Sequence, residues 1–538
     1  MLNSRIRLIT IFTFISIFFI ALIIRLSMMS LNGMEDNNSK TPSSKFSMRG
    51  SIFDRHGNTL AVNQLVSSVF AHPKKFDEKE FKLKLDQLSK VLGVSKTDLI
   101  KSLNVKKSFN WLKRKVSKEI GDKIKALKMQ GVSVKDEYKR IYPYNNIASH
   151  VIGFTGTDNT GLEGLEYSFN AVLKPDINEN DYLKINYGND LYLTIDSRFQ
   201  EISQGVLKKG IESNQAEGGS IIIADSSNGE ILTLANYPDF ENNNFNSYPS
   251  TSFRNVAIAN YYEPGSIFKM FTAAILLEED LVKEDEKFTC SGKVSVSGRE
   301  ITCVANHGSV TLRDILKKSC NVGIVKASLR IPKKTFYNYL ELFGFGKKTD
   351  IELAGESSGL LRPLRELTHL SKGMTSFGYE IGVTPIQLLM ASASLANGGI
   401  LYKPLIIKKI SNKEDKVTKY FYPSVVRETV SHITSEKIMN LVKAVLEKGG
   451  TGEKANIRGL NISGKTSTIN IFNHKTLKYD ENQVNAAFIG FIPLHSRTLV
   501  VLIIVRKPQL RKIASHVVVP MFKTLVENLM DNGLLHQD

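Results

Sequence analysis

The stretch YYEPGSIFKMF, residues 261–271, decides how the chain is interpreted. A proline and a glycine form a turn signal directly before Ser266, and the apolar run over residues 266–280 predicts a helix. Ser266 and Lys269 would then lie one turn apart on the same face of that helix. A serine hydroxyl becomes a nucleophile when a base accepts its proton, and a lysine amine is such a base once burial or another cation lowers its pKa. A Ser-x-x-Lys match is weak by itself, and a solvated Ser–Lys pair is the alternative.

Two later stretches strengthen this prediction only in combination. KKSCNVG contains a Ser-x-Asn motif, Ser319 with Asn321. SGKTSTI lies on a predicted strand and contains a Lys-Thr-x-Thr motif, made of Lys465, Thr466, Ser467 and Thr468. Each of these two later motifs has a chance match elsewhere in the chain, but the order Ser-x-x-Lys, Ser-x-Asn, Lys-Thr-x-Thr is far more specific than any one of them.

Length and charge bound the class of protein. A chain of 538 residues is too long for one core, so two or three domains are expected. Lysine and arginine total 71 against 53 aspartates and glutamates, a formal net charge of +18, which favours an anionic partner. The lysines are spread along the chain and no nucleic-acid-binding motif accompanies them. We therefore interpret them as a solvated surface and expect no nucleic-acid partner.

The N-terminus predicts a membrane anchor. Residues 8–24 carry no charge and would form a helix about 26 Å long, close to the roughly 30 Å of a bilayer core. Arg5 and Arg7 precede this segment and favour a cytoplasmic N-terminus. A cleaved signal peptide is the alternative, but no small-x-small cleavage site follows the apolar run. The predicted divisions are a cytoplasmic tail (1–7), a single transmembrane anchor (8–28) and a polar tether (29–46), with the rest of the chain outside the cytoplasm.

The remainder predicts two α+β domains, over residues 47–190 and 191–538. The first contains two strands around a turn at 55–58 and a lysine-rich, helix-prone stretch over 75–130. In the second, two strands within 218–238 and three within 460–508 are separated by a segment, 264–450, in which helices dominate, and a last helix covers 521–530. We expect the two early and three late strands to form one central antiparallel sheet flanked by helices.

The three cysteines leave alternatives open. In an oxidising compartment Cys290 and Cys303 could form a disulfide, which would leave Cys320 as an odd thiol. His307 lies four residues after Cys303 and could join these two cysteines as a metal ligand. Zinc normally takes four ligands at tighter spacing, so the sequence predicts neither a metal nor another cofactor.

With these motifs in place, the chain resembles a class B penicillin-binding protein over nearly its whole length. RGSIFDRHGNTLA, RIYPYNNIASHVIGF and GLEGLEYSFN are similar to pieces of that family's non-catalytic pedestal. LTIDSRFQ, SFGYEIGVTPIQL and FIGFIP are similar to landmarks of its transpeptidase domain. The resemblance implies a membrane-anchored serine D,D-transpeptidase of the cell wall, with a pedestal over 47–190 and a penicillin-binding domain over 191–538.

The resemblance also implies roles for the motif residues. Ser266 would be the nucleophile, acylated by the penultimate D-alanine of a peptidoglycan stem peptide or by a β-lactam. Lys269 would be its base, with a pKa lowered in part by the second cation, Lys465. Ser319 would pass a proton to the leaving amine, and Asn321 would orient Lys269 and hold a substrate amide.

The third motif would bind the terminal carboxylate and the oxyanion. Lys465 and Thr466 supply a cation and a hydroxyl for the carboxylate. The backbone N–H groups of Ser266 and Thr468 would form the oxyanion hole. The family usually has glycine where this chain has Ser467, and a hydroxymethyl group is expected to crowd the substrate face of the strand or to add a hydrogen bond there.

Several alternatives stay open at this stage. GESSG, residues 355–359, fits the nucleophile elbow of α/β-hydrolases, although a proline follows where a helix is required. A β-lactamase or a receptor with the same motifs is a second alternative, and a non-catalytic scaffold of the wall-synthesis machinery is a third. Within the family, the compact pedestal favours septal synthesis at division over side-wall elongation. Either role implies a glycosyltransferase partner in the membrane, because no second catalytic domain is visible.

Overall fold

The structure is a computed structural model. It describes residues 12–13, 15–23, 25, 47–75, 78–102, 108–175, 186–473, 476 and 478–535. Residues 47–176 and 187–538 together form one compact unit. The predicted tail and tether lie outside the described residues, and the described positions of the predicted anchor are helical and largely exposed. Within the described part of the chain, no helix combines the length and the apolar character that crossing a bilayer requires.

Five antiparallel strands form a central sheet in the order β18-β19-β20-β8-β9. The strands are β8 (Gly218–Asp225), β9 (Ile231–Tyr237), β18 (Ser463–Asn473), β19 (Lys478–Pro493) and β20 (Thr498–Arg506). Strands β8 and β9 come early in the predicted second domain, and β18, β19 and β20 come near its C-terminal end. The prediction that early and late strands close one sheet is therefore confirmed, and it leaves β18 at an edge.

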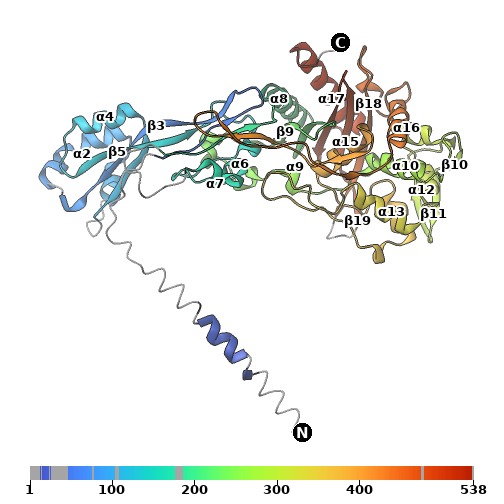
Figure 1. Ribbon diagram of the computed structural model, residues 1–538, viewed down its shortest axis with the longest axis horizontal. Helices are drawn as coiled ribbons and strands as arrows, with labels where there is room; N and C mark the ends of the chain where they lie inside the picture. The colour runs from blue at the N-terminus through green and yellow to red at the C-terminus, as the bar shows by residue number, and fades with distance from the viewer. Residues whose placement is uncertain are drawn as a thin grey trace, which may run out of the picture. The chain divides into compact units, whose positions relative to one another are not determined.

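Both faces of the central sheet are buried. Every residue of β8 is buried, as is β20 from Leu499 to Val505, which explains their continuous apolar sequences. Helices α8 (Ser197–Ser213) and α17 (Ala514–Asp531) lie side by side on one face (Figure 1), where Phe522 of α17 packs on Phe488 of β19 with ring centroids 4.8 Å apart. Helix α15 (Pro385–Ala396) is buried on the other face, with α10 (Lys269–Glu278) and α16 (His432–Lys443) beyond it.

A second, seven-stranded sheet runs through the N-terminal part of this unit in the order β16-β15-β7-β2-β3-β4, with β5 also paired to β3. Its strands are β2 (Ile52–Phe53), β3 (Thr59–Ala71), β4 (Asn110–Val116), β5 (Val132–Ile141), β7 (Asp190–Leu193), β15 (Ile407–Ser411) and β16 (Val417–Tyr420). The predicted strand–turn–strand at the start of the first domain is confirmed, with the turn closed by a hydrogen bond from Asp54 N to Asn58 O of 2.9 Å. The sheet crosses the boundary predicted at residue 190, because β15 and β16 belong to the later part of the chain.

The lysine-rich stretch folds mostly as predicted. It forms α2 (Glu78–Leu92), α3 (Lys96–Ser102) and α4 (Lys118–Ala126), and β4 lies between the last two of these helices. Their apolar faces meet in a small separate core that includes Leu88, Leu99 and Ile124. Helix α4 lies against β3 and β5, and α2 contacts α4 (Figure 1). Most lysines of these helices lie on the solvated side.

A buried ion cluster ties the first segment of this unit to the rest. Glu166 is completely buried and forms an ion pair with the guanidinium group of Arg49 and a second, of 2.6 Å, with Arg140. The segment around Glu166 forms two short helices, α6 (Gly164–Ser168) and α7 (Asn170–Leu173), which are separated at Phe169. The buried carboxylate of Glu166 is thus paired with two guanidinium groups, as a charge inside a protein requires.

The middle of the chain contains more strands than predicted. Short hairpins interrupt the expected run of helices: β10 (Phe288–Cys290) pairs with β13 (Gly308–Val310), β11 (Lys293–Val296) with β12 (Arg299–Thr302), and β14 (Ile400–Tyr402) with β17 (Val425–Glu428). The helices there are α9 (Val256–Ala259), α10, α11 (Leu312–Lys317), α12 (Asn321–Ser328), α13 (Lys333–Leu342), α14 (His369–Thr375), α15 and α16. The prediction that helices dominate this segment is confirmed, but the short hairpins were not predicted, because strands of three or four residues have too short a pattern to detect.

Candidate active site

Ser266 lies in a single 3-10 turn, η4 (Gly265–Phe268), and Lys269 is the first residue of α10. Gly265 has a φ of 56°, in the left-handed region that glycine adopts without cost. Its backbone N–H donates to Gly378 O at 3.1 Å, so the turn before Ser266 is fastened to a neighbouring loop. The predicted placement of serine and lysine one turn apart is confirmed, with a tighter 3-10 turn in place of the expected first turn of the helix.

The amine of Lys269 is the centre of the site. Its Nζ lies 2.7 Å from Ser266 Oγ and 2.7 Å from Asn321 Oδ1. It also lies 3.2 Å from Ser319 Oγ and 3.1 Å from Ser319 O. The side chain is completely buried. The structure therefore brings the first two motifs together around one amine, which rules out the solvated Ser–Lys pair.

The second motif is a turn between α11 and α12. Ser319 has a φ of 57°, a conformation that residues with a side chain rarely adopt, and this aims both its hydroxyl and its carbonyl at Lys269. Asn321 opens α12, and its Nδ2 donates to Thr302 O at 3.1 Å while its Oδ1 faces Lys269. The orientation of the Asn321 amide is thus set from both ends.

Lys465 of β18 reaches the same place from the sheet. Its Nζ lies 3.2 Å from Ser319 Oγ and donates to Thr466 O at 3.1 Å. Ser319 Oγ is therefore shared by the two lysine amines. Lys465 is completely buried, and only the Ser319 hydroxyl group bridges its amine to that of Lys269.

The neighbouring residues of β18 alternate between two sides of the strand. Thr466 and Thr468 lie on the opposite side from Lys465: Thr466 Oγ1 is 2.7 Å from Thr451 Oγ1, and Thr468 Oγ1 accepts from Ala514 N at 2.8 Å. Ser467 points to the same side as Lys465, toward Gly265, where a Cβ atom on that glycine would overlap its Oγ. Strand alternation thus turns Ser467 toward η4, the turn that carries Ser266, and its Oγ makes no hydrogen bond to the described residues.

Burial is the main cause of the unusual acidity of both lysines. It lowers the pKa of Lys269 to about 7. Burial, followed by repulsion from Lys269, holds the pKa of Lys465 well below its usual range. The predicted mutual repulsion is present, but it acts on the pKa of Lys465, while desolvation accounts for that of Lys269. A neutral Lys269 amine near pH 7 is the form that can accept a proton from Ser266.

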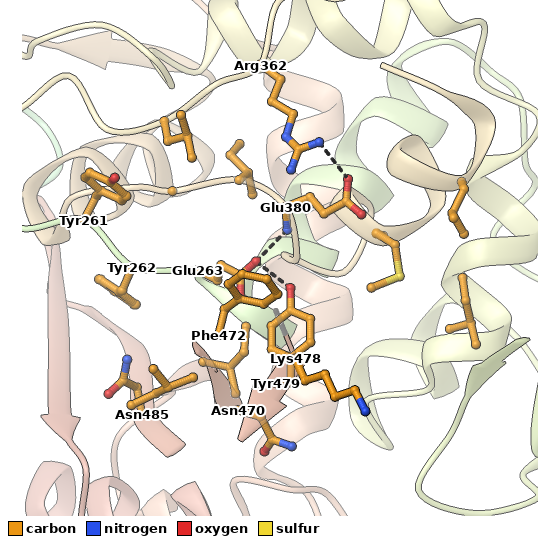
Figure 2. Close-up of a pocket in the computed structure, with 18 of the residues that line it drawn as sticks. Tyr261, Tyr262, Glu263, Arg362, Glu380, Asn470, Phe472, Lys478, Tyr479 and Asn485 are labelled. Atoms are coloured by element: carbon orange, nitrogen blue, oxygen red, sulfur yellow. Dashed lines mark hydrogen bonds and ion pairs between the residues drawn. The ribbon is translucent and has the colours of Figure 1, made fainter. Parts of the chain in front are cut away.

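A cavity of about 890 Å³ lies beyond the site, between the far end of β18 and the segment that precedes Ser266. Figure 2 shows Glu263 at its centre, where the carboxylate accepts hydrogen bonds from Tyr479 OH at 2.8 Å and Glu380 N at 2.7 Å. Arg362 lies 4.0 Å from Glu380 at the upper edge of this view. Burial raises the pKa of Glu263. Ile469 lines the cavity and also contacts η4, so the cavity continues along β18 from the cluster around Lys269.

Two further sequence interpretations can be judged. Ser357, the centre of the GESSG stretch, lies in a loop that no helix follows directly, so it is not a nucleophile elbow.

Cys290, Cys303 and Cys320 are all free thiols. Cys320, which lies between Ser319 and Asn321 in the sequence, has its Sγ 3.8 Å from Cys303 Sγ. Only the fold brings distant cysteines together, so no sequence signal could have revealed this contact.

These features define a serine acyltransferase site of the penicillin-binding type, and comparison with known proteins gives the family. Residues 219–527 match the penicillin-binding protein transpeptidase domain, and residues 44–205 match the penicillin-binding protein dimerisation domain. The chain belongs to the penicillin-binding protein transpeptidases, and the predicted class B assignment is confirmed.

Two relatives match most of the chain, and one of them is named as a transpeptidase. Peptidoglycan D,D-transpeptidase FtsI of Escherichia coli (strain K12) is 32% identical over 495 residues, which cover 86% of this chain and 80% of that protein. Stage V sporulation protein D of Bacillus subtilis (strain 168) is 35% identical over 486 residues, which cover 86% of this chain and 74% of that protein. The crystal structure of penicillin-binding protein 3 from Mycobacterium tuberculosis, complexed with aztreonam, has the same fold, with a TM-score of 0.74 at 22% identity over 92% of this chain and 98% of that one.

Proposed function

We propose that the chain is a peptidoglycan D,D-transpeptidase that cross-links stem peptides through an acyl-enzyme on Ser266. The observation that carries the proposal is the buried network in which Lys269 Nζ contacts Ser266 Oγ, Asn321 Oδ1 and Ser319 Oγ at 2.7, 2.7 and 3.2 Å. A neutral amine this close to a serine hydroxyl is in hydrogen-bond reach of the proton it must accept.

The acylation step follows from these contacts. Ser266 Oγ attacks the carbonyl carbon of the penultimate D-alanine while its proton moves to Lys269. The C–N bond to the last D-alanine then breaks, and the leaving amine receives a proton through Ser319, whose hydroxyl contacts both lysine amines. In the second step the amine of an acceptor peptide attacks the Ser266 ester, which restores the serine hydroxyl and forms the cross-link.

Three groups would hold the substrate during this reaction. The terminal carboxylate would lie near Lys465, Thr466 and Thr468, and its negative charge would stabilise the protonated form of Lys465. Because β18 pairs on one side only, alternate backbone N–H groups face η4, which supports an oxyanion hole made by the N–H groups of Ser266 and Thr468. The cavity beyond Ile469 has room for the rest of the stem peptide.

The wider assignments belong to the same proposal. Residues 8–28 would anchor the chain in the cell membrane, with 1–7 cytoplasmic and the remainder outside, and 47–190 would form a pedestal for the catalytic domain over 191–538. The relatives named FtsI favour a role in septal wall synthesis, with elongation as the alternative. A membrane glycosyltransferase that supplies glycan strands is the expected partner, contacted through the anchor and pedestal.

Covalent labelling tests the function. The full-length chain in detergent is incubated with a fluorescent penicillin, and the labelled peptide is mapped. We expect the label on Ser266, none in Ser266→Ala, and normal labelling in Ser357→Ala, which serves as the matched control. If the folded wild-type chain takes up no label, the proposed enzymatic function is wrong and a role as a non-catalytic scaffold is favoured instead.

A further inference from the structure

Three cysteines and one histidine meet next to the turn that carries Ser319. They are Cys290, Cys303, His307 and Cys320, and one ligand atom from each lies within 4.8 Å of all the others. We propose that this Cys3His cluster binds a zinc ion. The sequence left the fourth ligand unidentified, and the fold supplies it from the turn of the second motif.

The separations within the cluster fit tetrahedral zinc. With Zn–S bonds of about 2.3 Å and Zn–N bonds of about 2.0–2.1 Å, a tetrahedron has edges of about 3.8 Å between two sulfurs and about 3.6 Å between sulfur and nitrogen. The Sγ atoms of Cys303 and Cys320 are 3.8 Å apart. His307 Nδ1 lies 3.5 Å from Cys303 Sγ and 3.7 Å from Cys290 Sγ. An ion at the centre of these atoms would therefore require little movement of any ligand.

The four ligands come from three separate segments that the fold holds in place, since Cys303 and His307 share the loop between β12 and β13. Cys290 ends β10 and pairs in register with Gly308, which brings His307 alongside it. Cys303 follows β12, and its backbone N–H donates to Gly292 O at 2.8 Å. Cys320 caps the N-terminus of α12. Ligands fixed by separate backbone elements form a site before the ion arrives, unlike ligands gathered on one mobile loop.

The surroundings of the sulfur atoms suit thiolates. The backbone N–H of Asn321 points to Cys303 Sγ at 3.3 Å, and the N–H of Gly323 donates to Cys320 Sγ at 3.2 Å. Such N–H groups stabilise the negative charge that cysteine carries when it binds a metal. Three thiolates and one imidazole are soft donors that favour zinc over magnesium or calcium, and a set of four protein ligands marks a structural site.

A disulfide is the competing use of these residues. Cys303 and Cys320 are close enough for one after a small movement, but a disulfide would leave Cys290 and His307 gathered there without a function. A zinc ion uses all four side chains. The observations therefore favour the metal, and the disulfide becomes an outcome of the test.

The position of the cluster indicates what the ion would do. Cys320 lies between Ser319, whose φ of 57° is strained for a residue with a side chain, and Asn321, whose amide orients Lys269. An ion on Cys320 would fasten this turn to the β10–β13 hairpin. If the proposed function holds, zinc thus positions Ser319 and Asn321 without touching the substrate.

Metal content of the full-length chain in detergent tests the site directly. We expect about one zinc ion per chain by mass spectrometry in the wild type, in Ser266→Ala and in His369→Ala, which removes an exposed histidine outside the cluster. Cys290→Ser and His307→Ala should lose most of it. Cobalt added to the zinc-free wild type should give thiolate-to-cobalt charge-transfer absorption, and this absorption should be absent in the two ligand variants.

Further readouts keep the metal separate from catalysis and from misfolding. Chelation of the wild type should lower its thermal midpoint and slow penicillin labelling, and added zinc should restore both. Zinc retained at the wild-type level in both ligand variants would overturn the proposal. A zinc-free wild type with either a Cys303–Cys320 disulfide or three alkylatable thiols would overturn it as well. Ser266→Ala should keep its zinc although it cannot be labelled by penicillin. The zinc proposal and the proposed transpeptidase function can therefore fail independently.

Discussion

The hydroxyl of Ser467 lies against the backbone of Gly265, the residue that begins the turn that carries Ser266. The two are so close that a Cβ atom on Gly265 would overlap Ser467 Oγ. Ser467 is buried, and its Oγ has no hydrogen-bond partner among the described residues. A hydroxyl in this state is destabilising by about 1–3 kcal/mol relative to a paired one. The third motif thus makes a packing contact, through Ser467, with the turn that carries Ser266.

Replacing Ser467 should reveal what this contact does. We expect Ser467→Gly and Ser467→Ala to acylate with a fluorescent penicillin at the wild-type rate or faster, because both remove the unpaired hydroxyl. Ser467→Val should acylate at least about tenfold more slowly, because its larger side chain must push η4 away from β18. A wild-type rate in Ser467→Val would show that the contact does not control the position of Ser266.

The acylation rate should depend on pH through Lys269. Burial lowers the pKa of this lysine to about 7, and only the neutral amine accepts the Ser266 proton. The second-order rate of penicillin acylation should therefore be constant above about pH 8 and fall by about tenfold per pH unit below about pH 6. Thermal midpoints over the same range serve as the control for unfolding. A rate that stays flat through pH 7 would contradict the role of Lys269 as base.

Asn321→Asp should move this pH profile in a known direction. The substitution places a carboxylate where Asn321 Oδ1 now lies, 2.7 Å from Lys269 Nζ. An adjacent negative charge stabilises the protonated amine, so the midpoint of acylation should rise by about 1–3 pH units. Asn321→Ala is the control, since it removes the hydrogen bond without adding charge. If the midpoint of the pH profile is unchanged in Asn321→Asp, the residue at position 321 does not influence the protonation of Lys269.

The buried ion cluster should dominate the stability of the N-terminal part. Glu166→Ala leaves Arg49 and Arg140 buried without their counter-charge, and breaking a buried pair in this way costs about 3–5 kcal/mol. Asp158→Asn is the matched control, because Asp158 is exposed where it pairs with Arg114, and such surface pairs contribute less than about 1 kcal/mol. The thermal midpoint of each full-length variant gives the comparison. Equal midpoints for the two variants would mean that the buried charges find new partners.

Much of this protein could be predicted from its sequence because the relevant signals are local. The proline–glycine turn, the one-turn spacing of Ser266 and Lys269, and the apolar runs of β8 and β20 each depend on residues close together in the chain. Those patterns predicted the five-stranded sheet and the three motifs of the site. Their order along the chain carried the resemblance to the family, which the comparisons confirmed.

The tertiary structure decided whatever depends on which distant side chains meet. Cys290 and Cys320 lie in different elements, and only folding brings them to one point. The side to which Ser467 points follows from strand alternation relative to Lys465, and its neighbour Gly265 follows from the packing of η4 on β18. The low pKa of Lys269 likewise results from complete burial rather than from any neighbour in sequence. Local patterns determine elements, whereas contacts, desolvation and metal-ligand geometry exist only once those elements are packed together.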